Sequence, residues 1–280
     1  MTPSVMAVVL FAAALHAGWN AVVKGGQDTF LTTLLVAASA ALVAALVLPW
    51  LPAPARASWP YLAASSILQA LYFVLVAAVY RGGDMSLAYP LMRGSAPLLV
   101  ALMSLPVTGE TLSEGGWAGL ALLCGGVFSL VGSPSGSTKR SPRTVSLALL
   151  NAGVIAGYTL IDGVGVRLSG AAAAYTMWVF LLTAIPLLAV VAWRQPRRFI
   201  AYARQRWLPG LAGGLGTLSS YGLALWAMTQ APIPAVAALR ETSIVFATLL
   251  AALVFKERIG RQRLLATGLI LAGAMLLRLA

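Results

Sequence analysis

Apolar residues in this 280-residue chain occur in long blocks separated by short polar segments. Each block runs for about 20 residues, the length of helix that crosses a hydrocarbon core of about 30 Å. The sequence does not contain the alternating segments of about ten residues that are typical of a membrane β-barrel. The pattern therefore predicts an all-α integral membrane protein.

Ten such blocks predict ten transmembrane helices. The expected spans are 4–24, 29–50, 58–81, 85–107, 115–132, 144–167, 172–193, 208–229, 233–255 and 262–279. The longest polar stretch between them, residues 133–143, is rich in Ser, Pro and Gly, as a linker is. It separates a first half of five spans, residues 1–132, from a second half of five spans, residues 144–280.

The two halves carry a weak internal repeat. Shifting the first half by 147 residues places Arg93 on Arg240 and Glu110 on Glu257, together with one glycine pair and five apolar pairs. The Arg and Glu matches are the informative ones, because only 9% of the chain is charged. Since each half has an odd number of spans, the second half must enter the membrane from the opposite side. We therefore expect two inverted five-helix repeats around a central cavity.

Composition and charge narrow the class of protein. With 60% hydrophobic and 9% charged residues, the chain is far from the roughly 25% charged residues of soluble domains. The net charge of +12 does not indicate nucleic-acid binding, because the basic residues lie in short loops without aromatic residues between them. The single cysteine, Cys124, excludes a disulfide within the chain, and we expect no metal site and no cofactor.

The basic loops predict an orientation. Of the 19 Lys and Arg residues, 14 lie in the loops after spans 1, 3, 5, 7 and 9, and three lie on the other side. This bias predicts that those loops, including the 194–206 loop, are cytoplasmic and that both termini are outside. The expected location is the cell inner (plasma) membrane, which the chain crosses several times.

Two arginines lie inside predicted spans, and they are the strongest candidates for function. A charge at the bilayer centre costs about 2.5–3.5 kcal/mol, so Arg93 and Arg240 need a carboxylate, a water-filled cavity or an anionic ligand. One interpretation is that both line the cavity. The alternative is structural: Arg240 pairs locally, or both arginines tie helices together by bonding carbonyls. Glu241 is next to Arg240 but points about 100° away from it on a helix, towards a different neighbour.

A second cluster lies on the first helix of each half. His16 and Asn20 are four residues apart and share a helix face, and so do Tyr158 and Asp162. Trp19 borders the first pair. The alternative for His16 is a hydrogen bond across helices, and for Asp162 it is snorkelling to the membrane interface.

Three further tyrosines offer hydroxyl groups and aromatic walls, although packing or interface roles remain open for each. The complete set of candidate substrate-binding residues is His16, Trp19, Asn20, Tyr72, Tyr89, Arg93, Tyr158, Asp162, Tyr221, Arg240 and Glu241. Glu110 and Glu257, at span ends, are expected to join helices.

The turn and final helix of each half resemble the repeat of the drug/metabolite transporter superfamily, in its ten-span metabolite-exporter branch of EamA type. The segments are Gly109-Glu110 through Gly126 and Lys256-Glu257 through Gly273, and the start Leu15-His16-Ala17-Gly18-Trp19-Asn20 is similar to one bacterial branch. The resemblance covers essentially the whole chain. It implies a secondary carrier that works by alternating access without ATP. Many such carriers keep both termini in the cytoplasm, whereas the charge bias here predicts the reverse.

Known members of that group export amino acids and other metabolites, and relatives move nucleotide sugars or sugar phosphates. We therefore expect an exporter of a small metabolite with a carboxylate or phosphate-like group, first of all an amino acid or related organic anion. Asp162 or Glu241 would meet an amino group or carry a coupling proton. The alternative class, an intramembrane lipid-modifying enzyme, lacks a nucleophile with a base or paired carboxylates in the sequence.

Overall fold

The computed structural model describes residues 1–82, 85–132, 142–254, 256 and 259–279, and every regular element in them is helical. The helices of the first half are α1 (Pro3–Lys24), α2 (Thr29–Val47), α3 (Trp59–Gly82), α4 (Met85–Thr108) and α5 (Glu114–Ser129). Those of the second half are α6 (Pro142–Ser169), α7 (Ala172–Arg194), α8 (Pro196–Met228), α9 (Ile233–Leu239), α10 (Ser243–Leu253) and α11 (Arg261–Leu279).

Eight helical stretches among the described residues are long and apolar enough to cross a membrane, which is consistent with an integral membrane protein. Two helices of the expected set do not meet that description. Helix α5 has only 16 residues, and the membrane part of α8 contains several Gly and Ser residues, which lower its mean hydropathy. In the stretch Ile233–Leu253, α9 and α10 form one span.

Local sequence sets several helix starts. The side chain of Asp28 accepts a hydrogen bond from the Leu31 amide at 3.0 Å, and Ser113 accepts one from the Gly116 amide at 3.1 Å. Asp and Ser satisfy free amides of a first helical turn in this way, which explains why α2 and α5 begin after these residues.

Two segments differ from the sequence-based prediction. The 194–206 segment, expected as a loop, is helical from Pro196 onwards and forms the first part of α8. A kink at Arg206 (φ −123°, ψ 21°) separates it from the rest of that helix. Span nine, expected to be continuous, is broken by a 3₁₀ turn at Arg240–Thr242. A 3₁₀ turn inside a helix is often found where side chains serve a function. Of the expected linker, residues 133–141 lie outside the described residues, and α6 begins at Pro142.

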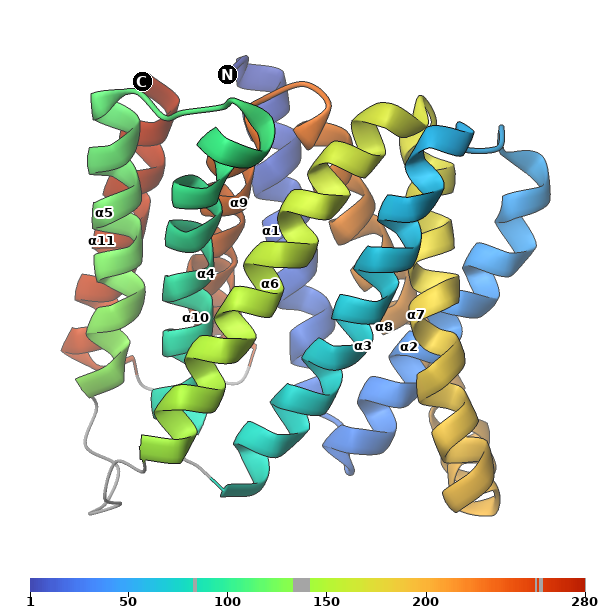
Figure 1. Ribbon diagram of the computed structural model, residues 1–280. Helices are drawn as coiled ribbons and strands as arrows, with labels where there is room; N and C mark the ends of the chain where they lie inside the picture. Colours follow the sequence, from blue (N-terminus) through green and yellow to red (C-terminus); the bar gives the residue numbers. More distant parts are fainter. Residues whose placement is uncertain (83–84, 133–141, 255, 257–258, 280) are drawn as a thin grey trace.

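The two ends of the bundle differ in their loops (Figure 1). Both termini lie at one end, which we call the termini end. The opposite end, where α1 finishes and α11 begins, carries most of the described basic loop residues, and we call it the basic end. The described basic residues at this end are Lys24, Arg143, Arg194, Arg197, Arg198, Arg204, Arg206, Lys256, Arg261 and Arg263.

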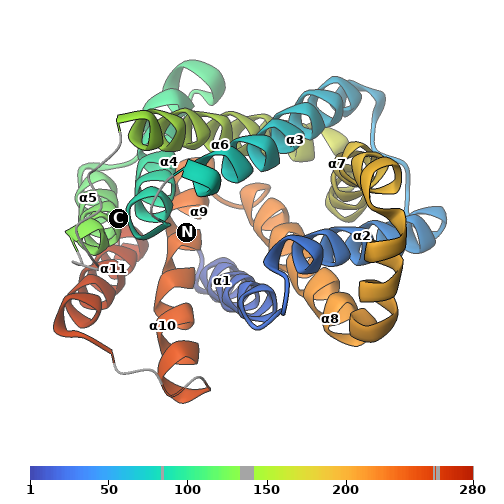
Figure 2. The same ribbon diagram turned by 90° about the horizontal axis from the view of Figure 1, so that it is seen from below.

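Helices from the two halves pack against one another throughout the bundle. Along its axis, α5 and α11 lie side by side at one edge and α2 lies beside α7 at the other (Figure 2). Between these edges, α1 packs against α8 and α3 packs against α6. The α5–α11 contact is close because a Cβ atom on Gly273 would lie only 2.5 Å from the carbonyl oxygen of Gly119. Small residues permit this approach of two helix backbones.

The largest apolar core occupies the middle of the bundle and its termini end. Tyr175, Val179, Leu225, Met228 and Ile233 belong to it, and each is less than 2% exposed. These side chains come from α7, α8 and α9. They leave the space below them, towards the basic end, to polar and aromatic residues.

Candidate substrate cavity

A cavity lies at the centre of the bundle, below the apolar core. The space open to the centres of water molecules is about 160 Å³. At roughly 10–15 Å³ per water by the same measure, this would hold on the order of ten waters or one small organic molecule. Helices from both halves contribute to its wall. The lining residues are His16, Trp19, Asn20, Thr33, Val36, Ala37, Gln69, Tyr72, Phe73, Tyr89, Met92, Arg93, Ile155, Tyr158, Phe180, Thr183, Ala184, Leu187, Thr217, Ser220, Tyr221 and Arg240.

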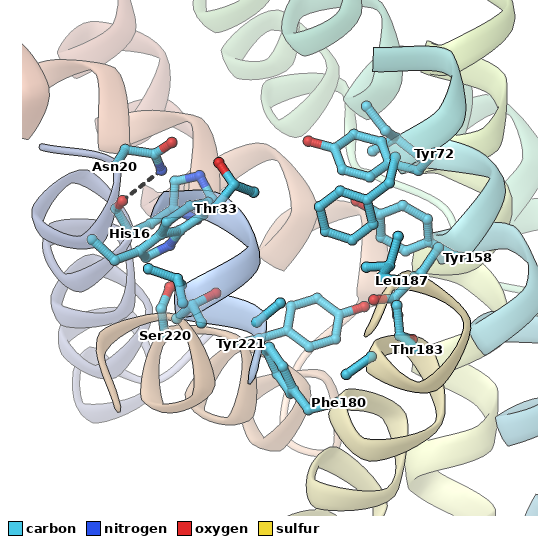
Figure 3. A pocket seen from close by; sticks show the side chains of 18 of the residues that line it. His16, Asn20, Thr33, Tyr72, Tyr158, Phe180, Thr183, Leu187, Ser220 and Tyr221 are labelled. Atoms are coloured by element: carbon cyan, nitrogen blue, oxygen red, sulfur yellow. Dashed lines mark hydrogen bonds between the residues drawn. The ribbon is translucent and has the colours of Figure 1, made fainter. Parts of the chain in front are cut away.

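Nine of the eleven candidate residues from the sequence line this one cavity. They are His16, Trp19, Asn20, Tyr72, Tyr89, Arg93, Tyr158, Tyr221 and Arg240. Figure 3 shows His16 and Asn20 on one side, facing Tyr72 and Tyr158 on the other. Among the lining residues, Asp162 and Glu241 are absent, and each instead bonds to a residue that does line the cavity.

Arg93 is neutralised by a carboxylate from the other half. Its Nε atom lies 2.9 Å from Oε2 of Glu241, and the side chains are 14% and 6% exposed. Nη2 of Arg93 also donates to the hydroxyl of Ser243 at 3.4 Å. The expectation that Glu241 points away from Arg240 towards a different helix agrees with this ion pair. Arg93 thus has the carboxylate partner that a buried charge needs, and it also lines the cavity.

Arg240 is in a different situation. It lies in the 3₁₀ turn between α9 and α10 and is partly exposed. Its guanidinium carbon lies 5.1 Å from the centre of the Tyr221 ring, a cation–π distance. No carboxylate of the described residues lies within ion-pair distance of it. The two arginines share one cavity, but only Arg93 has a carboxylate partner there.

Asp162 lies behind the cavity wall and is 0% exposed, so the snorkelling interpretation is wrong. Its carboxylate accepts hydrogen bonds from neutral donors, among them Tyr221 at 2.5 Å, Tyr175 at 2.9 Å and Gln69 at 3.2 Å. Tyr221 lies between Asp162 and Arg240. Its hydroxyl donates a hydrogen bond to Asp162, and its ring face lies against the Arg240 guanidinium. Helix periodicity predicts Asp162 and Tyr158 on one face, but only Tyr158 lines the cavity, whereas Asp162 lies behind it and is hydrogen-bonded to Tyr221.

The first helix contributes a polar patch to the cavity. The Asn20 amide donates to the carbonyl of His16 at 2.7 Å (Figure 3). The His16 ring meets the Trp19 ring edge-on at 5.2 Å between centres. Nε1 of Trp19 and the hydroxyl of Thr183 are buried and have no hydrogen-bond partner among the described residues. Buried polar groups are normally satisfied, so these two are available to a ligand.

Several lining residues were not among the sequence-based candidates. Gln69, Phe73, Phe180 and Thr183 come from α3 and α7, helices that carry no charge at cavity depth. Phe180 packs edge-on against Tyr221 at 6.0 Å between ring centres. The sequence signal for Gln69 is a second polar residue, Ser65, four positions before it on the same helix face. In the structure, the Gln69 amide donates a hydrogen bond to the Ser65 hydroxyl at 3.0 Å.

A second cavity of about 420 Å³ adjoins the first on the side of the basic end. His16, Asn20 and Tyr89 line both cavities, and the second continues to Gly260, Gln262 and Arg263 at the start of α11. The two cavities are therefore neighbours along α1, and the second extends to the basic end of the bundle.

The termini end is closed by polar contacts above the apolar core. Arg167 pairs with Glu110 at 2.8 Å and donates to the carbonyls of Met228 (2.7 Å) and Ala231 (3.0 Å). The other carboxylate oxygen of Glu110 accepts the amide of Ile233, at the start of α9, at 2.8 Å. Glu110 thus joins helices, as expected. Its repeat partner Glu257 lies outside the described residues.

Comparison with known proteins supports a transporter. Residues 142–279 match the EamA-like transporter family, which supports the resemblance to the drug/metabolite transporter superfamily and favours a multi-pass membrane transporter of small molecules. A solved structure titled "Crystal structure of protein" has the same fold, with a TM-score of 0.80 at 20% identity, and the alignment covers 100% of this chain and 98% of that one. No curated protein matches the chain. The family consists of transporters, so the alternative of a lipid-modifying enzyme finds no support.

Proposed function

We propose that this protein is a secondary transporter that moves a small organic anion, such as an amino acid or related carboxylate, by alternating access of the central cavity. The observation that carries the proposal is the cavity itself. It lies between the two halves of an apolar helical bundle, and the two intramembrane arginines both line it. Transporters commonly bind their substrates at such an interface between repeats.

The contrast between the two ends supports alternating access. The cavity is continued towards the basic end by a second cavity, while the termini end is closed by an apolar core and the Glu110–Arg167 pair. A carrier that is open to one side at a time requires this kind of asymmetry. The proposed orientation places the basic end in the cytoplasm of the cell, so the described state faces inwards. Export would begin from this state.

The α5–α11 contact supports inverted repeats. A Cβ on Gly119 would meet the carbonyl of Gly273 at 2.8 Å, and one on Gly126 would meet the carbonyl of Ala266, also at 2.8 Å. The offset of 147 residues pairs Gly119 with Ala266 and Gly126 with Gly273. The contact is thus reciprocal, as in an interface with two-fold symmetry, and the two helices run antiparallel. Antiparallel equivalent helices favour an axis in the membrane plane, with residues 1–132 and 144–280 as the two repeats.

Transport by purified protein in proteoliposomes tests the proposal. Vesicles loaded with unlabelled candidate carboxylates and amino acids, diluted into medium with a trace of the labelled compound, should accumulate label by exchange. Exchange needs neither ATP nor knowledge of the coupling ion, which we expect to be a proton. The screen therefore reports the carrier activity directly.

Two matched variants on α2 give this assay its control. Ala37 lines the cavity, so Ala37→Phe should fill it and abolish exchange. Ala45, two turns further along, is exposed on the outer surface of the helix, so Ala45→Phe should retain exchange. Absence of protein-dependent exchange for every compound, or equal exchange in both variants, would contradict the proposed function.

A further inference from the structure

Arg93 and Arg240 are equivalent in the repeat, but among the described residues only Arg93 has a carboxylate partner. The position that supplies this partner in one half is a glycine in the other. Glu241 neutralises Arg93 across the two halves at 2.9 Å. The same offset of 147 residues pairs Glu241 with Gly94, so the repeat-equivalent position in the first half has no side chain. A Cβ on Gly94 would lie 2.8 Å from the ring of Phe128. A side chain at this position would require Phe128 to shift, and among the described residues Arg240 has no ion-pair partner equivalent to the one that Arg93 has.

The acidic groups near the cavity are both engaged behind its wall. Asp162 accepts hydrogen bonds from Tyr221, Tyr175 and Gln69, and Glu241 holds Arg93. Among the described residues that line the cavity, there is no carboxylate. A ligand ammonium would meet no carboxylate in the cavity wall and would lie near Arg240, which has no ion-pair partner among the described residues; this is unfavourable in a site of low dielectric constant.

The rest of the wall is built for an apolar, flat ligand body with acceptor atoms at one end. Aromatic rings surround the space, and Tyr72 and Tyr158 meet edge-on at 6.1 Å between ring centres. The two buried polar groups without partners, Trp19 Nε1 and the Thr183 hydroxyl, can both donate hydrogen bonds. Hydrogen-bond donors, a guanidinium without an ion-pair partner among the described residues, and aromatic walls together match a carboxylate on an aromatic or other apolar body.

From these contacts we infer that Arg240, and not Arg93, binds the charged group of the substrate, and that the substrate class is an aromatic or apolar monocarboxylate without an ammonium group. This inference rests on the proposed function and narrows it, since it disfavours the zwitterionic amino acids. Glu241 has a specificity role because it removes Arg93 from anion binding and so limits the cavity to a single negative charge.

Four ligands that share a phenylethyl skeleton test the inference on purified protein in detergent. They are 3-phenylpropionate, its neutral amide 3-phenylpropionamide, the zwitterion phenylalanine and the cation phenethylamine. We expect 3-phenylpropionate to bind at least about ten times more tightly than the other three, the loss expected when a hydrogen bond to a charged group is removed. Preference for phenylalanine or phenethylamine, or binding of none of the four at millimolar concentration, would overturn the inference.

Variants assign the effect to Arg240. Arg240→Gln should lower the affinity for 3-phenylpropionate about 10- to 100-fold and leave that for the amide nearly unchanged, whereas Arg240→Lys should retain part of the preference. The ratio of the two affinities is measured on folded protein, so it stays informative if a variant is less stable. Arg278→Gln, at an exposed position on α11, is the control for loss of a positive charge. An unchanged ratio in Arg240→Gln would contradict the role given to Arg240.

Glu241→Gln tests the specificity role separately. Freeing Arg93 should add a second site for negative charge, so the affinity for the dianion phenylsuccinate should rise relative to 3-phenylpropionate by about tenfold. No change in this ratio would contradict the role of Glu241. Exchange of any amino acid in proteoliposomes without these preferences would leave the proposed function standing and refute only the inference.

Discussion

The termini end and the basic end of the bundle use their polar residues in opposite ways. At the termini end, Asp162, Glu110 and Arg167 are saturated by contacts within the protein, and apolar side chains fill the space between them. Towards the basic end, the helices enclose two adjacent cavities, and polar groups such as Trp19 Nε1 have no partner among the described residues. Satisfied polar groups stabilise a closed end, whereas unsatisfied ones at a cavity are available to a ligand.

The largest effect is expected at Asp162, directly above the cavity. Asp162→Asn removes the charge that accepts hydrogen bonds from Tyr221, Tyr175 and Gln69. Loss of a hydrogen bond to a charged group costs about 1.5–3 kcal/mol, so the free energy of unfolding should fall by about that amount. Reversible unfolding in mixed micelles measures it. A variant as stable as the wild type would show that the Asp162 contacts do not stabilise the closed end.

A smaller effect is expected at the Glu110–Arg167 pair. Glu110→Gln removes the ion pair, but the remaining side-chain oxygen can still accept the amide of Ile233. Because the two side chains are 20% and 32% exposed, the loss should be about 1 kcal/mol. A double-mutant cycle with Arg167→Gln isolates the coupling between them. Additive single effects would mean that the pair does not hold the helices together.

The smallest effect is expected at the basic end, where Arg198 pairs with Asp28 at 2.7 Å and is 62% exposed. Asp28→Asn loses this pair but keeps a side-chain oxygen to cap α2, so the free energy of unfolding should change by less than about 0.5 kcal/mol. It is the control for Asp162→Asn, because both replace one carboxylate by an amide. A loss as large as that of Asp162→Asn would remove the distinction between the two ends.

The sequence alone predicts the helical class and many of the residues that line the cavity. It does not predict which other residues these side chains contact. Arg93 and Arg240 were found because a charge inside an apolar block is costly, and this cost does not depend on knowing the fold. Asp162 and Glu241 were assigned to the cavity although they lie behind it. Periodicity gives the face of a helix, but the neighbour that covers this face, here Tyr221 or Arg93, is fixed only by tertiary packing.

Helix boundaries likewise follow from the sequence pattern only where tertiary packing does not change them. The apolar block at 233–255 gave no sign of the 3₁₀ turn at Arg240–Thr242, because the block is apolar on both sides of it. The helical segment after Pro196 was missed because its charges resemble a loop. Its Phe199 and Tyr202 nevertheless pack against apolar residues of α2 and α7, including Leu31 and Val191.

The central claim, that opening of one end accompanies closing of the other, can be tested with two matched reporters. Thr176 is buried on α7 at the termini end, and Thr33 lines the cavity on α2. Each is replaced singly by cysteine in a Cys124→Ala background, because Cys124 is the only native cysteine. An impermeant thiol reagent in nanodiscs, where both faces are accessible, should label Thr33→Cys quickly and Thr176→Cys slowly.

The decisive measurement repeats this labelling after the termini end is weakened by Arg167→Ala, which removes the contacts to Glu110, Met228 and Ala231. Alternating access predicts that Thr176→Cys is labelled faster and Thr33→Cys is labelled more slowly, because a single equilibrium governs both ends. If Thr176→Cys is labelled faster while Thr33→Cys keeps its full rate, the two ends open independently. That result would contradict the transport mechanism proposed for this protein.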